Sequence, residues 1–165
     1  MVPKASETSG VYGAHLVEVY TDNVPPIFKR EAMKVSEALG TMDAYRVWEK
    51  EFDIQMEEMK AAIDAAYPDK RAVVHQYLSV YAEWLGFEVV GKFGPGELTP
   101  QNLLKLVRLK PAVIIDNWHN ISGLPLAESL DCPYVELINF PGHGGTESIL
   151  DVFDYNRDQF IRATK

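Results

Sequence analysis

The sequence predicts an α/β domain, in which a four-stranded parallel sheet has helices on both faces and is preceded by a long amphipathic helix. From residue 68 onward, short apolar runs alternate with helix-like segments, as is typical of strands that are buried on both faces of a parallel sheet. Helix signals separate the runs: Gly86 ends one helical pattern and Thr99-Pro100 begins another. Polar residues follow each run, at the edge where open parallel sheets bind ligands.

Composition narrows the class of protein. The 165 residues are 47% hydrophobic, which suits one domain with a helical extension. The formal net charge is −8 without a basic stripe, so we expect no nucleic-acid partner. Cys132 is the only cysteine, which excludes an internal disulfide and a CxxC metal site.

No apolar run approaches the ~20 residues that a membrane-spanning helix needs. The first ten residues are polar and lack the apolar core of a secretory signal. We therefore expect either a cytoplasmic protein or a mature chain from which a leader has been removed.

The chain divides into three predicted regions. Residues 1–24 form a leader with a short strand at Leu16–Tyr20, residues 25–67 form a helical linker, and residues 68–165 form the α/β lobe. In the linker we expect one helix from Pro26 to Leu39 and a second from Met42 to Ala66. Apolar residues three or four apart form a stripe on the second helix that should lie on a core: Tyr45, Trp48, Phe52, Met56, Met59 and Ile63.

In the lobe the strands and helices should alternate regularly. We expect strands at Arg71–His75, Phe87–Lys92, Ala112–Asp116 and Tyr134–Ile138, and helices at Tyr77–Leu85, Pro100–Leu109, Leu124–Leu130 and Glu147–Ala163. Thr146 is the expected cap of the last helix.

Candidate metal ligands follow three of these strands. His75 ends the first strand, His119 follows the third, and Asn139 and His143 follow the fourth. Neutral imidazole is a common ligand for zinc and similar metals, and ligands from separate loops can build such a site. Each histidine also has a simpler interpretation: a core residue for His75, a solvated loop residue for His119 and a turn residue for His143. His15 lies apart from the sheet pattern, which alone would make it a surface residue.

A glycine-rich loop enters the last helix. The backbone N–H groups of Gly144, Gly145 and Thr146 could bind an anion there, although a plain turn is the alternative. The loop is neither a P-loop nor a dinucleotide fingerprint. No GxSxG motif or nucleophile–base set is present.

Several motifs resemble the carboxy-terminal lobe of the zinc/manganese solute-binding proteins of ABC importers. A strand that ends in His75 is followed by an aromatic-rich helix and by Leu85-Gly86-Phe87-Glu88-Val89-Val90-Gly91, similar to the family's "GLEVVG" strand. Thr99-Pro100 is similar to the family's "TP/SP" helix start, and residues 134–142 resemble its "VVVLDPLG" strand and loop. The helix at 42–66 is similar to the helix that links the family's two lobes.

The resemblance implies two α/β lobes with one metal ion between them. His75 then corresponds to the metal ligand of this lobe, which is glutamate in manganese types, so zinc is expected rather than manganese. Asn139 stands where the family has an aspartate ligand, and His143 could substitute. His15 corresponds to the histidine that precedes the linking helix, while the amino-terminal lobe has no counterpart.

The resulting hypothesis is a non-enzymatic lobe that binds a divalent metal ion and passes it to an ABC permease. The resemblance places it in the periplasm or outside the cytoplasmic membrane, and the missing lobe or a second chain would complete the site. The alternative is a small α/β enzyme with His75 or His119 as general base and an anion on the glycine-rich loop. A third interpretation is an interaction module that docks through an exposed Trp118.

Overall fold

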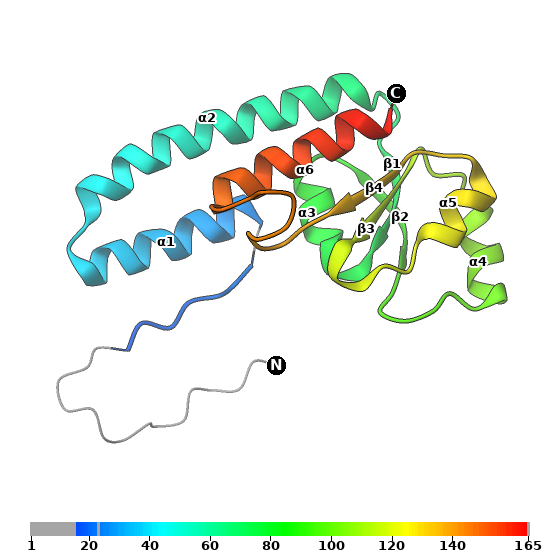
Figure 1. Cartoon of the computed structure of the whole chain (residues 1–165), viewed down its shortest axis with the longest axis horizontal. Helices are drawn as coiled ribbons and strands as arrows, with labels where there is room; N and C mark the ends of the chain where they lie inside the picture. The colour runs from blue at the N-terminus through cyan, green and yellow to red at the C-terminus, as the bar shows by residue number, and fades with distance from the viewer. Residues whose placement is uncertain (1–15, 23, 165) are drawn as a thin grey trace.

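The computed structural model describes residues 16–22 and 24–164, and its elements follow the predicted order (Figure 1). The α-helices are α1 (Pro25–Leu39), α2 (Met42–Ala66), α3 (Ser79–Trp84), α4 (Pro100–Val107), α5 (Leu124–Leu130) and α6 (Ile149–Ala163). The strands are β1 (Arg71–His75), β2 (Glu88–Phe93), β3 (Val113–Asn117) and β4 (Tyr134–Leu137). Two 3-10 helices, η1 (Gln76–Leu78) and η2 (Trp118–Asn120), directly follow β1 and β3.

The sheet confirms the predicted fold class. Its order is β2-β1-β3-β4, and every neighbouring pair is parallel. From β1 the chain moves to β2 on one side, and it then returns past β1 to β3 and β4. β1 and β3 are therefore the central neighbours from which the chain runs in opposite directions, and this position in an open α/β sheet is where ligands bind.

Each face of the sheet buries its own apolar core. On one face, strand residues such as Val74 and Ile115 pack with Phe52 of α2, Tyr81 of α3 and Phe153 of α6. On the other face, the alternate strand residues pack against α4 and α5 through side chains that include Val73, Ile114, Leu106 and Leu126. The strands are buried on both sides, which explains why they read as continuous apolar runs rather than as alternating ones.

The two N-terminal helices form an antiparallel pair (Figure 1). Gly40 ends α1 in the left-handed region, with φ of 68°, where glycine has no side chain to strain. Phe28 of α1 packs on Trp48 and Phe52 of α2, and Lys29 pairs with Asp53. The residues of α2 also belong to the sheet's larger core, so the helical linker and the lobe share packing. The division at residue 67 stays a prediction.

Two local predictions are wrong. Leu16–Tyr20 forms no strand and Leu16 is 78% exposed; among the described residues this segment has no strand beside it to supply hydrogen bonds. Thr146 does not cap α6. Ser148 does so, in a capping box with Asp151, while the Thr146 hydroxyl donates to the carbonyl of His143.

Within residues 16–22 and 24–164, no helix is both long and apolar enough to cross a membrane.

Candidate functional site at the carboxyl edge of the sheet

His75 is the last residue of β1, and its side chain is fully buried. Its Nδ1 accepts a hydrogen bond from the backbone N–H of Tyr77 at 3.3 Å. A neutral imidazole has one donor and one acceptor nitrogen, so this contact assigns the ring proton to Nε2. Nε2 is buried and has no hydrogen-bond partner in the described part of the chain. A buried polar atom without a partner is costly and uncommon in a residue that serves packing alone.

The electrostatics of His75 have two opposed parts. Burial lowers the pKa of its imidazole, because the charged form loses hydration, and the negative charge of Asp116 acts in the opposite direction. Burial has the larger effect, so the ring is neutral at physiological pH. A neutral imidazole retains a lone pair, which is the form that binds metal ions.

Asp116 lies beside His75 and was not among the predicted site residues. The paired register of β1 and β3 runs to Val74 opposite Ile115, so His75 and Asp116 come next on the two strands and share a face of the sheet. Asp116 is fully buried. The sequence signal for it was its place at the end of a buried strand, but the tight set of donors around it depends on the tertiary fold.

Four donors satisfy the Asp116 carboxylate. Its Oδ2 accepts from the backbone N–H groups of Ser122 at 2.9 Å and Gly123 at 2.6 Å, and from the Tyr134 hydroxyl at 2.9 Å. Its Oδ1 accepts from the backbone N–H of Asn117 at 2.7 Å. The carboxylate thereby fixes the loop that leaves β3 and holds a negative charge at the reversal point of the sheet.

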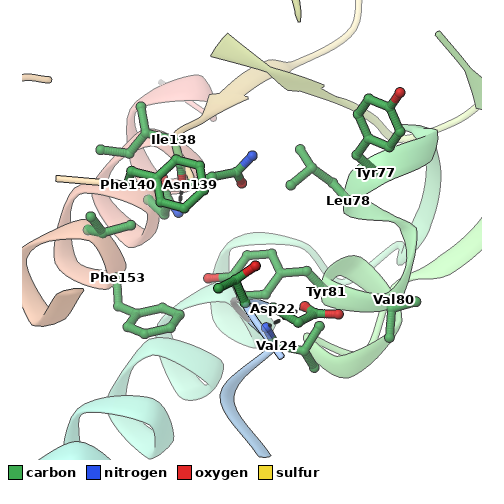
Figure 2. A pocket seen from close by; sticks show the side chains of 13 residues that line it. Asp22, Val24, Tyr77, Leu78, Val80, Tyr81, Ile138, Asn139, Phe140 and Phe153 are labelled. Carbon is green, nitrogen blue, oxygen red and sulfur yellow. Dashed lines mark hydrogen bonds between the residues drawn. The ribbon is translucent and has the colours of Figure 1, made fainter. Parts of the chain in front are cut away.

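Asn139 lies in a separate place from His75. It lines a cavity of about 220 Å³ on the face of the sheet that carries α3 and α6, and Figure 2 shows its amide directed into that space. The residues before α1 close another side of the cavity, which brings the Asp22 carboxylate to its lining. Its apolar walls include Tyr81, Phe140 and Phe153. His75 itself is not among the lining residues.

His119 and His143 form a third group around one indole ring. The Trp118 ring lies 4.2 Å from the His143 ring and 4.9 Å from the His119 ring, centroid to centroid. His119 is exposed, and His143 and Trp118 are half-buried, so Trp118 is partly covered rather than free for docking. Near this group burial raises the pKa of the Glu136 carboxyl, with the Asp116 charge adding to the shift and His143 opposing it.

Hydrogen bonds within the glycine-rich loop occupy some of its own backbone N–H groups. The Gly142 N–H donates to the carbonyl and hydroxyl oxygens of Thr146, and the Thr146 N–H donates to His143. Two further N–H groups at the start of α6 donate to the Asp151 carboxylate, which already supplies a negative charge there. Anion binding by Gly144, Gly145 and Thr146 therefore stays a prediction.

The structure thus distributes the predicted ligands over three places at one edge of the sheet. No group of three or more His, Cys, Asp or Glu side chains within residues 16–22 and 24–164 could hold a metal ion. His15 lies outside the described residues. Among the three described histidines, His75 stands out because it combines a strand end at the reversal point, complete burial and an unpartnered ring nitrogen.

Comparison with solved structures places the fold. The periplasmic zinc binding protein TroA from Treponema pallidum matches with a TM-score of 0.65 and 16% identity, over 86% of this chain and 62% of that chain. The laminin binding protein Lmb of Streptococcus agalactiae, described as an adhesin with metal transporting activity, matches with a TM-score of 0.64 and 19% identity, over 93% of this chain and 69% of that one. The binding protein FpvC from Pseudomonas aeruginosa, in complex with Ni2+, matches with a TM-score of 0.64 and 15% identity, over 86% of this chain and 60% of that one.

The fold is that of the metal solute-binding proteins. The resemblance noted in the sequence motifs is therefore confirmed at the level of structure. The chain spans about 60–69% of the length of these three proteins. No family model matches the sequence. No curated protein matches it either.

Proposed function

We propose that this chain is a non-enzymatic lobe that binds a divalent metal ion as the cargo of an ABC importer, with zinc favoured over manganese. The observation that carries the proposal is the buried His75 imidazole with its unpartnered Nε2. His75 lies on β1, at the point where the strand order of the sheet reverses, and the fold of the chain is that of metal solute-binding proteins. Imidazole favours zinc, whereas manganese prefers oxygen ligands.

The chemistry assigns His75 the role of the anchoring ligand. Nε2 becomes the ligating nitrogen when the ring proton moves to Nδ1, and this exchange breaks the 3.3 Å contact in which Nδ1 accepts from the Tyr77 N–H. Asn139, His143 and His119 are the further ligands on this edge, and His15 is another from outside the described residues. Since the described residues form no complete set, we propose that a second lobe or a second chain supplies the remaining ligands. Delivery to a membrane permease, outside the cytoplasm, completes the proposed role.

The test is a metal titration of the full chain. Zinc should raise the melting temperature and bind in a calorimetric competition with a chelator, manganese should bind more weakly, and magnesium should have no effect. His75→Gln should abolish the zinc response. Gln76→Ala is the matched control, since it changes the adjacent exposed side chain and leaves the imidazole intact.

Two results would contradict the proposal in different ways. A wild-type chain that responds to zinc no more than to magnesium, at concentrations that allow self-association, would remove the metal-binding function. A full zinc response in His75→Gln would leave the function standing and remove His75 from the site.

A further inference from the structure

We propose that residues 94–98, between β2 and α4, form a strap over His75: Gly94 closes the space beside Nε2, and a metal ion reaches this nitrogen only after the strap has moved aside. The proposal rests on the proposed function and deepens it, because it assigns control of access to a segment that contains none of the candidate ligands.

Three residues pack against the imidazole of His75. The Phe93 ring lies edge-on to it, with ring centroids 5.6 Å apart, and the centre of the Tyr77 ring is 5.0 Å away. Gly94 lies against the edge of the ring that carries Nε2: a Cβ built on Gly94 would be 2.3 Å from Nε2 and 2.5 Å from Cδ2. Gly94 therefore occupies the space from which a ligand or a hydrogen-bond partner would approach the unpartnered Nε2.

This contact leaves too little room for a bound metal ion. A zinc ion on Nε2 would lie about 2.0–2.1 Å from the nitrogen, and the far side of its ligand shell would reach about 4 Å from it. The Gly94 Cα is about 1.5 Å from the position of the built Cβ, so it lies within about 3.8 Å of Nε2. Ligation at Nε2 therefore requires Gly94 to move, in addition to the proton exchange between the two ring nitrogens.

The strap can move without disturbing the sheet or α4. Gly94 and Gly96 have φ of 73° and 104°, in the region where glycine is unstrained and conformationally free. Residues 95–97 are exposed, and within residues 16–22 and 24–164 no hydrogen bond involves residues 96–98. Leu98 anchors the far end by apolar packing. The strap also lines a cavity of about 330 Å³ together with residues of α4, so there is space beside it.

The test compares Gly94→Ala with Gly40→Ala in the full chain. The two glycines have nearly the same left-handed backbone, with φ of 73° and 68°, so alanine strains both to a similar extent. A Cβ on Gly40 meets nothing within 4 Å, whereas a Cβ on Gly94 overlaps the His75 ring. The methyl group at residue 94 therefore opposes closure of the strap, and Gly40→Ala controls for the backbone strain.

Four measurements report on the strap. Diethyl pyrocarbonate acylates accessible neutral imidazoles, and peptide mass spectrometry gives its rate at His75, with the exposed His119 as internal reference. This rate is measured on metal-free protein, well above the ordinary histidine pKa of about 6.5. Chelator competition gives the zinc Kd, and stopped-flow mixing gives the rate of zinc binding. The coupling between cadmium-113 and 15N identifies the ligating nitrogen.

In the wild type and in Gly40→Ala, His75 should react much more slowly than His119. The rate of zinc binding should level off at high zinc concentration, because opening of the strap limits it. Gly94→Ala should accelerate the acylation of His75 about 10–100-fold, since overpacking destabilises the closed strap. It should also lower the zinc Kd, because the apparent Kd falls as the binding-competent fraction rises. A methyl group that only crowded the site would raise the Kd instead.

Three results would overturn the proposal. One is acylation of His75 as fast as that of His119 in the wild type, which decides the question even if Gly94→Ala does not fold. Another is ligation through Nδ1, which needs no movement of Gly94. The third is weaker zinc binding by a folded Gly94→Ala. A wild type that binds no zinc, but whose His75 is protected and becomes reactive in Gly94→Ala, removes the proposed function and supports the strap as the cover of His75.

Discussion

Replacing Asn156 with alanine should destabilise the fold at the strand end that leads into the cavity. Asn156 lies on α6 and is buried, and its amide forms a two-point clamp on Ile138. Its Nδ2 donates to the Ile138 carbonyl and its Oδ1 accepts from the Ile138 N–H, both at 3.0 Å. Ile138 is itself buried and directly precedes Asn139, so the clamp sets the position of a proposed ligand.

The magnitude follows from the two backbone groups that Asn156→Ala leaves unpaired. Each buried polar group without a partner costs about 1–3 kcal/mol. The expected loss in the free energy of unfolding is therefore about 2–4 kcal/mol, if part of the cost is relieved by local relaxation. For a chain of this size, 1 kcal/mol corresponds to roughly 2–4 °C in Tm, so Tm should fall by about 4–16 °C.

Urea unfolding followed by circular dichroism measures this loss, with Asn102→Ala on the exposed surface of α4 as the control. The midpoint of Asn156→Ala should fall at an unchanged slope, while Asn102→Ala stays within about 0.5 kcal/mol of the wild type. A loss in Asn156→Ala no larger than in the control would refute the reasoning. It would mean that water from the adjacent cavity hydrates the Ile138 backbone without cost.

Three further changes should have smaller or pH-dependent effects. Ser148→Ala removes the capping box of α6 and should lower the free energy of unfolding by about 1 kcal/mol in urea unfolding; no change would show that the cap is redundant. Hydrogen bonding and charge from Lys34, with Arg30 and the Tyr20 N–H, lower the pKa of the Glu31 carboxyl from 4.5 to about 2 despite its burial. Because the pKa of Glu31 is lower in the folded state, the ionised carboxylate stabilises the fold above pH 4.5, and this stabilisation disappears as the pH falls toward 2. The urea midpoint of Glu31→Gln should therefore fall less between pH 5 and pH 2.5 than that of the wild type. Parallel curves of midpoint against pH would contradict this. Gly123→Ala places a methyl group 2.6 Å from the Phe93 ring and should lower the free energy of unfolding by about 1–3 kcal/mol, with an undiminished urea midpoint as the contrary result.

The sheet could be predicted from the sequence because its strands are continuous apolar runs, which are typical of strands buried on both faces. Apolar runs such as Ala72–Val74 and Val113–Ile115 need cover on both faces, and the intervening helices can provide it only around a parallel sheet. Leu16–Tyr20 shows the limit of this reasoning. The segment has strand-forming residues, but a strand also requires a neighbour, and residue patterns do not show whether one is present.

The candidate site was only partly predictable for a related reason. His75 was identified because the sequence alone shows a histidine at the end of a predicted strand. Its neighbour Asp116 can be recognised as part of the site only when β3 is placed beside β1 and the loop at Ser122 and Gly123 folds back onto the carboxylate. The sequence shows that polar side chains reach the same edge, but not that Asn139 and His75 lie in different places on it.

The pairing of α1 with α2 has a mechanical consequence. α2 has 25 residues and is therefore roughly 37 Å long. Its Phe52 packs against Phe153 near the start of α6, so the turns of α2 before that contact extend past α6 and, together with α1, project beyond the sheet (Figure 1). A tilt of about 10° at the sheet end of this helix would displace its far end by roughly 6 Å. A small repacking of side chains between α2 and the lobe would thus produce a much larger displacement at the turn between the two helices.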